Sequence, residues 1–218
     1  EVRFHAPGEA TLNGAPASVD GRDGDALRLQ AVAAVVVPPP PKAPGGPRFE
    51  IEPPPPPLEA TSRPELLPST AALAAAAVVI EAEAYSGQGG GSVQITETKV
   101  GAQGKSFLHW DSEGHWLEWR VTLPAATRAR LLVRACTAES RVLRRLTVNG
   151  VTPPAAAAME FAGTGGYSNQ QDNWRTFAVA DAQGAPLPLE LPAGETVLRL
   201  ENVDGRSMNL DWIALEPL

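Results

Sequence analysis

Three carboxylates occur in two short segments near opposite ends of the second half of this 218-residue chain. Glu81 and Glu83 belong to Ile-Glu-Ala-Glu-Ala-Tyr at residues 80–85, and Asp211 belongs to Asn-Leu-Asp-Trp-Ile-Ala-Leu at residues 209–215. Both segments alternate polar with apolar residues, which is typical of half-buried strands. The first and last strands of a β domain often pair, so we expect the three acids to lie close together.

The chemistry of this acidic cluster has three interpretations. Calcium takes six to eight oxygen ligands, which carboxylates and backbone carbonyls can supply. The acids could instead be solvated or paired with cations. Glu81 and Glu83 on one strand would be about 7 Å apart, a separation that also suits an inverting glycosidase. Catalysis is the least favoured, because two acids on one strand do not face each other across a glycosidic bond.

The elements that must position these acids are short strands. From residue 78 onward, apolar or alternating runs recur at short intervals, and Gly, Asn and Asp turn residues separate them. This spacing, without a convincing amphipathic helix, predicts an all-β, antiparallel two-sheet β-sandwich over residues 78–218. Trp119 and Trp212 lie on apolar strand faces, so we expect both in the core.

The first third of the chain differs in composition. Thirteen of the 22 prolines fall between residues 38 and 68, and proline runs favour extended polyproline II. We therefore predict a Pro/Ala-rich linker over residues 38–77. The short strand-like runs in residues 1–37 predict a short β-rich segment. This segment is either the end of an upstream domain or a set of strands added to the sandwich. The chain starts at Glu1 instead of Met, so we expect a processed protein or a fragment whose signal peptide is gone.

Charge and composition exclude several classes of partner. The net charge of −7 disfavours nucleic acid and anionic membrane surfaces. No apolar run is long enough for a membrane span, so we expect no membrane insertion. The single cysteine, Cys136, excludes an internal disulfide framework and is expected to be buried. His109 and His115 lack metal-ligand spacing and are expected at the surface.

One group of aromatic and amide residues suits a sugar. Trp174 and Tyr167 flank a polar loop that includes Asn173, and a flat aromatic face with nearby amides matches the C–H face and hydroxyls of a sugar ring. The alternative is that these aromatics are core residues with a polar tip.

Several motifs in a fixed order resemble the carbohydrate-binding modules of families 6 and 35. After the opening Ile-Glu-Ala-Glu-Ala-Tyr come a glycine run and the segments at residues 114–121, 131–135, 146–150, 173–177 and 191–200, and the closing segment starts at Asn209. The resemblance covers about residues 78–218 and implies a jelly-roll sandwich. It also implies a structural calcium at Glu81, Glu83 and Asp211. The sugar site it implies lies in loops at one end of the sandwich and includes Trp174, Asn209 and an aromatic wall at Trp110 or His109.

The resemblance further implies a function. Such modules are non-catalytic and direct an attached secreted enzyme to a polysaccharide. We therefore expect an oligosaccharide or polysaccharide ligand, an upstream catalytic domain in the same polypeptide, and an extracellular or periplasmic location. Two rivals stay open: a structural or protein-interaction sandwich that does not bind sugar, and a small glycoside hydrolase or lyase.

Overall fold

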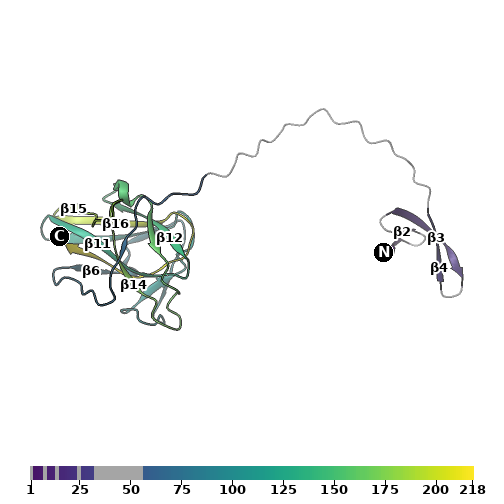
Figure 1. Cartoon of the computed structure of the whole chain (residues 1–218), viewed down its shortest axis with the longest axis horizontal. Helices are drawn as coiled ribbons and strands as arrows, with labels where there is room; N and C mark the ends of the chain where they lie inside the picture. Colours follow the sequence, from purple (N-terminus) through teal and green to yellow (C-terminus); the bar gives the residue numbers. More distant parts are fainter. Residues whose placement is uncertain (1, 7–8, 13–14, 24–25, 32–55) are drawn as a thin grey trace, which may run out of the picture. The chain divides into compact units, whose positions relative to one another are not determined.

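The computed structural model describes residues 56–218 in full, together with the backbone of residues 2–6, 9–12, 15–23 and 26–31. The chain divides into two compact units, Glu1–Pro54 and Pro55–Leu218. In the first unit, β1 (Val2–Ala6), β2 (Glu9–Leu12), β3 (Ala15–Asp23) and β4 (Ala26–Ala31) form an antiparallel sheet in chain order (Figure 1). The predicted β-rich segment is thereby confirmed. Most of the predicted linker, residues 32–55, lies outside the described residues.

The second unit is the predicted antiparallel sandwich. Its five-stranded sheet has the order β13-β12-β16-β10-β7, and its eight-stranded sheet runs β5-β14-β11-β17-β9-β8, with β15 beside β11 and β6 beside β17. The elements are β5 (Glu65–Leu66), β6 (Val78–Glu81), η1 (Ala82–Ala84), β7 (Gly87–Gly89), β8 (Gln94–Thr96), β9 (Ser106–Leu108), β10 (Trp116–Leu123), β11 (Thr127–Cys136), β12 (Arg141–Val148), η2 (Pro154–Ala156), β13 (Met159–Ala162), β14 (Arg175–Ala178), β15 (Leu189–Leu191), β16 (Gly194–Asn202) and β17 (Asn209–Pro217).

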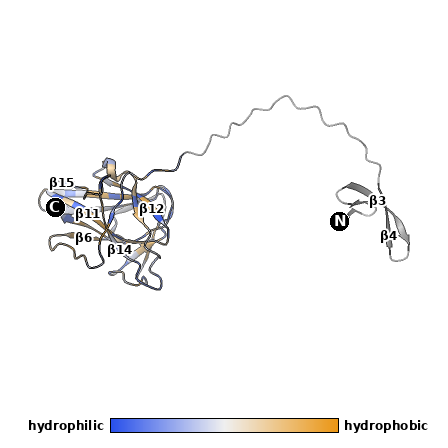
Figure 2. Cartoon of the chain, in the orientation of Figure 1, coloured by the Kyte–Doolittle hydropathy of each residue, from blue (hydrophilic) through white to orange (hydrophobic). Residues whose placement is uncertain are grey.

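The core lies between the two sheets and follows from the two-residue period of the strands. In β10, Leu117, Trp119 and Leu123 are buried and Val121 packs against the same core, whereas the alternate residues Glu118, Arg120 and Thr122 lie on the opposite face. Trp119 also donates its indole N–H to the Ala82 carbonyl at 3.1 Å, which connects the core to the opening segment. Figure 2 shows hydrophilic and apolar residues intermixed along the strands of this unit. The core placement of Trp119 is confirmed.

Trp212 is buried too, but in a second, smaller apolar cluster. It packs with Leu132, Ala178 and Ala214, whose neighbours along β11 and β17 belong to the main core. Side chains alternate across a strand, so this cluster covers the outer face of the eight-stranded sheet.

The sandwich unit starts well before the predicted boundary at residue 78. Thr61 pairs with the 155–158 segment, β5 adds to the edge of the eight-stranded sheet at β14, and Leu67 and Leu73 pack on the outer cluster. We call residues 61–77 the strap. The Pro/Ala-rich composition of the strap did not indicate that it pairs with the sandwich. An extended, proline-containing segment can pair at a sheet edge with few apolar side chains.

The expected burial of the single cysteine is confirmed. Cys136 is buried, and burial raises the pKa of its thiol to about 11. The described part of the chain contains no helix with the length and hydropathy of a membrane span.

Candidate functional site

The two acidic segments are brought together as predicted. β6 and β17 are antiparallel neighbours, with Glu81 opposite Trp212. The expectation that Glu81 and Glu83 share one strand is wrong, however. Glu81 ends β6, and Glu83 lies in the 3-10 turn η1, because the chain turns to bury Ala82 in the core.

A β-bulge sets the direction of Asp211. On β11, Arg134 lies opposite Trp212 and Ala135 lies opposite Leu210, so Asp211 is the extra residue of β17. Its fully buried carboxylate accepts hydrogen bonds from the Gln103 backbone N–H at 3.0 and 3.2 Å and from Arg134 Nη1 at 3.2 Å.

The three acids influence one another electrostatically. Burial raises the pKa of Asp211 to about 6; Gln103 and Arg134 oppose this increase, and the charges of Glu81 and Glu83 add to it. Burial and the charge of Glu83 also raise the pKa of Glu81. The Glu83 Oε2 atom is buried and has no hydrogen-bond partner among the described residues.

The carboxylate oxygens of these three acids have the chemistry that a hard cation such as calcium prefers. A bound cation would give the buried Glu83 Oε2 atom a partner and would reduce the repulsion among the carboxylates. Two observations act against a preformed cage. Arg134 already supplies positive charge to Asp211. Within residues 56–218, no three acidic, His or Cys side chains converge closely enough to enclose a metal ion.

Three of the predicted sugar-binding residues lie around the 167–168 backbone, and we call them the loop cluster: Tyr167, Asn173 and Asn209. Asn209 Nδ2 donates to the Tyr167 carbonyl at 3.3 Å, and Asn173 Oδ1 accepts from the Ser168 N–H at 3.3 Å. Gly166 allows this approach, because a Cβ there would lie 2.5 Å from Asn173 Oδ1. Tyr167 is half-buried, whereas Asn173 and Asn209 are buried.

Of the two candidates for the aromatic wall, only His109 is accessible. Its side chain is 59% exposed, and Nδ1 lies 3.9 Å from Asp111. Trp110 is fully buried, packs edge-on against Phe107 at 5.7 Å and donates its N–H to the His115 carbonyl at 2.9 Å. Trp110 therefore presents no open face to a sugar in this structure.

The expectation that His115 lies at the surface is wrong. The His115 side chain is fully buried, and burial lowers its pKa. Gly91 makes room for the imidazole, since a Cβ at Gly91 would lie 2.5 Å from His115 Nδ1.

Arg144 is fully buried, which its charge alone does not predict. Its guanidinium lies 4.3 Å from the centre of the Trp110 ring and donates to Asn202, Asp204 and the Arg206 carbonyl. Its position between Val142 and Leu146, on the inward face of β12, was the available signal.

Trp174 lies in a different setting from the loop cluster residues. Only 3% of the residue is exposed, and the Arg134 guanidinium lies 6.0 Å from its ring centre. The ring lines a groove of about 510 Å³ that also includes Trp212 and strap residues such as Leu73. Trp174 is thus no open platform in this structure.

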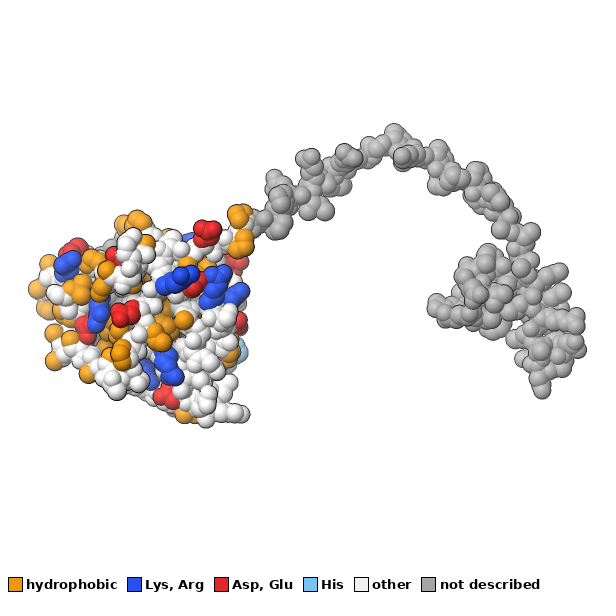
Figure 3. All heavy atoms as spheres, viewed as in Figure 1, with side chains coloured by type: hydrophobic (Ala, Val, Ile, Leu, Met, Phe, Trp, Pro, Cys, Tyr) orange, Lys and Arg blue, Asp and Glu red, His pale blue; other side chains and the backbone are white. Residues whose placement is uncertain are grey.

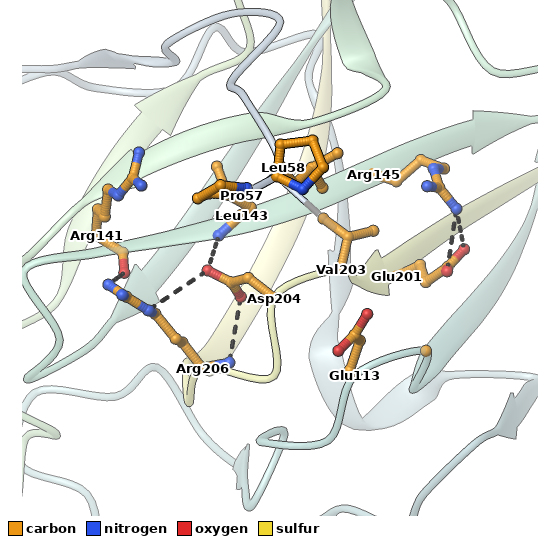
Figure 4. Close-up of a pocket in the computed structure, with 12 residues that line it drawn as sticks. Pro57, Leu58, Glu113, Arg141, Leu143, Arg145, Glu201, Val203, Asp204 and Arg206 are labelled. Carbon is orange, nitrogen blue, oxygen red and sulfur yellow. Dashed lines mark hydrogen bonds and ion pairs between the residues drawn. The ribbon is translucent and has the colours of Figure 1, made fainter. Parts of the chain in front are cut away.

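A second cavity, of about 550 Å³, lies over β12 and β16 (Figure 4). Its charged walls are largely paired: Arg145 meets both oxygens of Glu201 at 3.0 Å, and Asp204 accepts from the Leu143 N–H at 2.9 Å. Figure 3 likewise shows cationic and anionic side chains interspersed on the visible face of the sandwich.

The fold is shared with modules of known structure. A family 35 carbohydrate-binding module from Clostridium thermocellum matches with a TM-score of 0.54 and 20% identity, over 66% of this chain and 100% of that chain. Residues of the second unit therefore have the fold of a family 35 module. The predicted resemblance is confirmed at the level of the fold.

Two further structures extend the comparison. A Paenibacillus cycloisomaltooligosaccharide glucanotransferase matches with a TM-score of 0.51 and 17% identity, over 63% of this chain but 18% of the enzyme. A family 6 module from Clostridium stercorarium, solved with cellobiose, matches with a TM-score of 0.46 and 14% identity, over 65% of this chain and 94% of that chain. No protein-family model matches the chain, and no curated protein matches it.

Proposed function

We propose that the second unit is a non-catalytic carbohydrate-binding module that holds an attached enzyme of the same polypeptide on an extracellular or periplasmic polysaccharide. The observation that carries this proposal is the structural match to a family 35 module, which covers the whole of that module. The attachment to an enzyme is supported by the glucanotransferase, of which the matched part is a small fraction.

The loop cluster, with exposed His109, is the proposed sugar site. Tyr167 offers part of an aromatic face, and the buried Asn209 amide fixes the Tyr167 backbone. A single ring face with a few hydrogen bonds suits affinities between about 1 mM and 1 μM, or roughly −4 to −8 kcal/mol.

A glycan array followed by calorimetry on the best ligand tests this function. Tyr167→Ala should weaken binding about tenfold, the effect of losing roughly 1.4 kcal/mol of contact. Tyr167→Phe is the matched control: it keeps the ring and loses only the hydroxyl that contacts Glu139, so its affinity should remain close to wild type. Equal affinity for all three proteins would contradict the assignment of this site.

The burial of Trp110 and Trp174 favours one alternative, a protein-interaction sandwich that does not bind sugar. Wild-type protein that binds no glycan on a broad array would support this alternative over the proposed function. Turnover of a polysaccharide by the isolated chain would instead support the hydrolase or lyase rival.

We also propose that calcium binds at Glu81, Glu83 and Asp211, with Glu83 Oε2 as the acceptor that most needs a partner. A bound ion would stabilise the sandwich by about 2.7 kcal/mol at a hundredfold excess over its dissociation constant. Thermal unfolding with calcium and with chelator should show this difference in wild type and lose it in Glu83→Gln. The exposed Glu97→Gln is the control. An identical melt in both conditions, with no metal by elemental analysis, would contradict the proposal.

A further inference from the structure

The backbone at His109 adopts a conformation that residues other than glycine seldom take. Its φ of 65° lies in the left-handed region, which costs free energy for a residue with a Cβ and persists where the surrounding structure imposes it. The imidazole does not impose it, because that side chain is 59% exposed and its Nδ1 atom is 3.9 Å from Asp111, beyond hydrogen-bonding distance. The conformation is therefore set by the chain on either side.

The neighbours of His109 explain why the chain turns there. Phe107 in β9 and Trp110 are both fully buried, and their rings meet edge-on at 5.7 Å. In a continuous strand, residues three apart point to opposite faces. The chain must therefore leave the extended conformation between the two rings, and β9 ends at Leu108, directly before the left-handed His109. The left-handed residue thus lets both rings enter the core.

Trp110 is fixed both at its ring and at its backbone. The Arg144 guanidinium lies over the ring, 4.3 Å from its centre, and the indole N–H donates to the His115 carbonyl at 2.9 Å. The Trp110 carbonyl accepts from Asn202 Nδ2 at 3.1 Å and from Arg144 Nη2 at 3.4 Å. Arg144 therefore holds the residue that follows His109 at two separate points.

Arg144 is itself held in one orientation. Its Nη1 donates to the Leu143 carbonyl at 2.8 Å and to Asn202 Oδ1 at 3.1 Å, and its Nη2 donates to the Arg206 carbonyl at 2.8 Å. A buried charged pair is often less stabilising than apolar residues of similar size, so burial by itself does not favour arginine at this position. Arginine adds a planar, rigid fork that stacks on a ring and directs hydrogen bonds, which lysine lacks.

We propose that Arg144 is a positioning residue for the proposed sugar site: through Trp110, it keeps His109 in the left-handed conformation that presents the imidazole to the ligand. This inference rests on the proposed function and adds a buried support to it. Arg144 is fully buried, so its effect on a ligand passes through Trp110 and His109. Trp110 then supports the exposed His109 from below and is not itself the aromatic wall.

Urea unfolding of the sandwich in the full chain tests the link between Arg144 and His109 without a sugar. Glycine takes a positive φ freely, so His109→Gly should raise the folding equilibrium constant about fivefold, which corresponds to about 1 kcal/mol. In Arg144→Lys, which loses the planar stack, residue 109 can relax, and His109→Gly should bring no gain. Arg145→Lys is the matched control, an arginine of the same strand that pairs with Glu201, and the fivefold gain should persist there.

Trp110→Phe provides a second route if Arg144→Lys does not fold. It keeps an apolar ring and loses the indole hydrogen bond to the His115 carbonyl, so the gain from His109→Gly should shrink in this background too. The inference is overturned if His109→Gly brings no gain in wild type. It is also overturned if the gain is undiminished in whichever of Arg144→Lys and Trp110→Phe folds.

Calorimetry with a sugar tests the effect on the site, at a temperature well below the melting transition of each variant. The probe is whichever of cellohexaose, mannohexaose and isomaltohexaose binds wild type most tightly. Arg144→Lys and His109→Ala should each weaken binding about tenfold, and the double variant should bind no more weakly than either, because both remove the same contact. Arg145→Lys should bind like wild type. A purely structural role of Arg144 would lower stability and leave the affinity unchanged.

Three binding results would also overturn the inference: unchanged affinity in His109→Ala, unchanged affinity in Arg144→Lys, or losses that add in the double variant. In each of these cases the proposed function still stands when Tyr167→Ala weakens glycan binding. Absence of binding by all three probes overturns the inference, and absence of binding on the glycan array as well removes the proposed function.

Discussion

Individual buried charges in this sandwich are paired within the protein. Burial lowers the pKa of Arg144 to about 9, so the guanidinium stays protonated at neutral pH, and Asp204 lies 3.3 Å away. Asp211 is likewise neutralised by Arg134. An internal partner reduces what such a group can offer a ligand, which is why unpartnered Glu83 Oε2 carries the calcium proposal.

Glu160 gives a pH-dependent prediction. Hydrogen bonds and charge from Arg141 and then Arg63 hold the pKa of Glu160 below its usual value, although burial opposes them. A lowered folded-state pKa stabilises the protein above the unfolded pKa, and this stabilisation is lost as the pH falls through the folded pKa. Glu160→Gln should therefore cost about 1 kcal/mol in urea unfolding at neutral pH and progressively less below the usual carboxyl pKa.

The exposed pair of Glu190 with Arg128 supplies the control for this prediction. Glu190→Gln should change the unfolding free energy by only a few tenths of a kcal/mol, since solvent screens such pairs. A Glu160→Gln deficit that stays constant from neutral to acidic pH would show that packing, not charge, is responsible.

At the scale of elements, the strap and the bulge at Asp211 position the candidate sites. The bulge turns Asp211 toward Arg134, and the strap covers Trp212 and Leu132. Both are irregular, and the bulge lies at the proposed calcium site. Bulges next to functional sites commonly redirect a side chain in this way.

Leu73 tests how the strap is held. Leu73→Ala removes part of a half-buried side chain, which should cost about 1 kcal/mol of local stability. Amide hydrogen exchange should therefore become faster in residues 67–77 and stay unchanged in β11. Leu66→Ala is the matched control, because Leu66 is 51% exposed. Equal exchange in the two variants would mean that backbone pairing at β5, not Leu73, holds the strap.

For the whole molecule, the sequence predicted the regular parts and missed the irregular ones. Strand periodicity was sufficient for the sandwich and for pairing of β6 with β17, because alternation reports burial directly. It could not place Glu83 in a 3-10 turn or bury His115, since both depend on contacts between distant segments. Composition assigned residues 56–77 to a linker because edge pairing through backbone atoms leaves little trace in side-chain type.

Truncation tests where the stable unit begins. A chain of residues 55–218 retains the strap and should unfold at the temperature of the sandwich transition in the full chain. A chain of residues 78–218 loses the Thr61 hydrogen bonds, the Arg63–Glu160 ion pair and β5, and it exposes Leu132 and Trp212. Exposure of two large apolar side chains costs on the order of 3 kcal/mol or more, so this shorter chain should melt at a markedly lower temperature. Calorimetry of the three proteins measures the difference; equal transitions for the two fragments would restore the boundary at residue 78 and make the strap a dispensable cover.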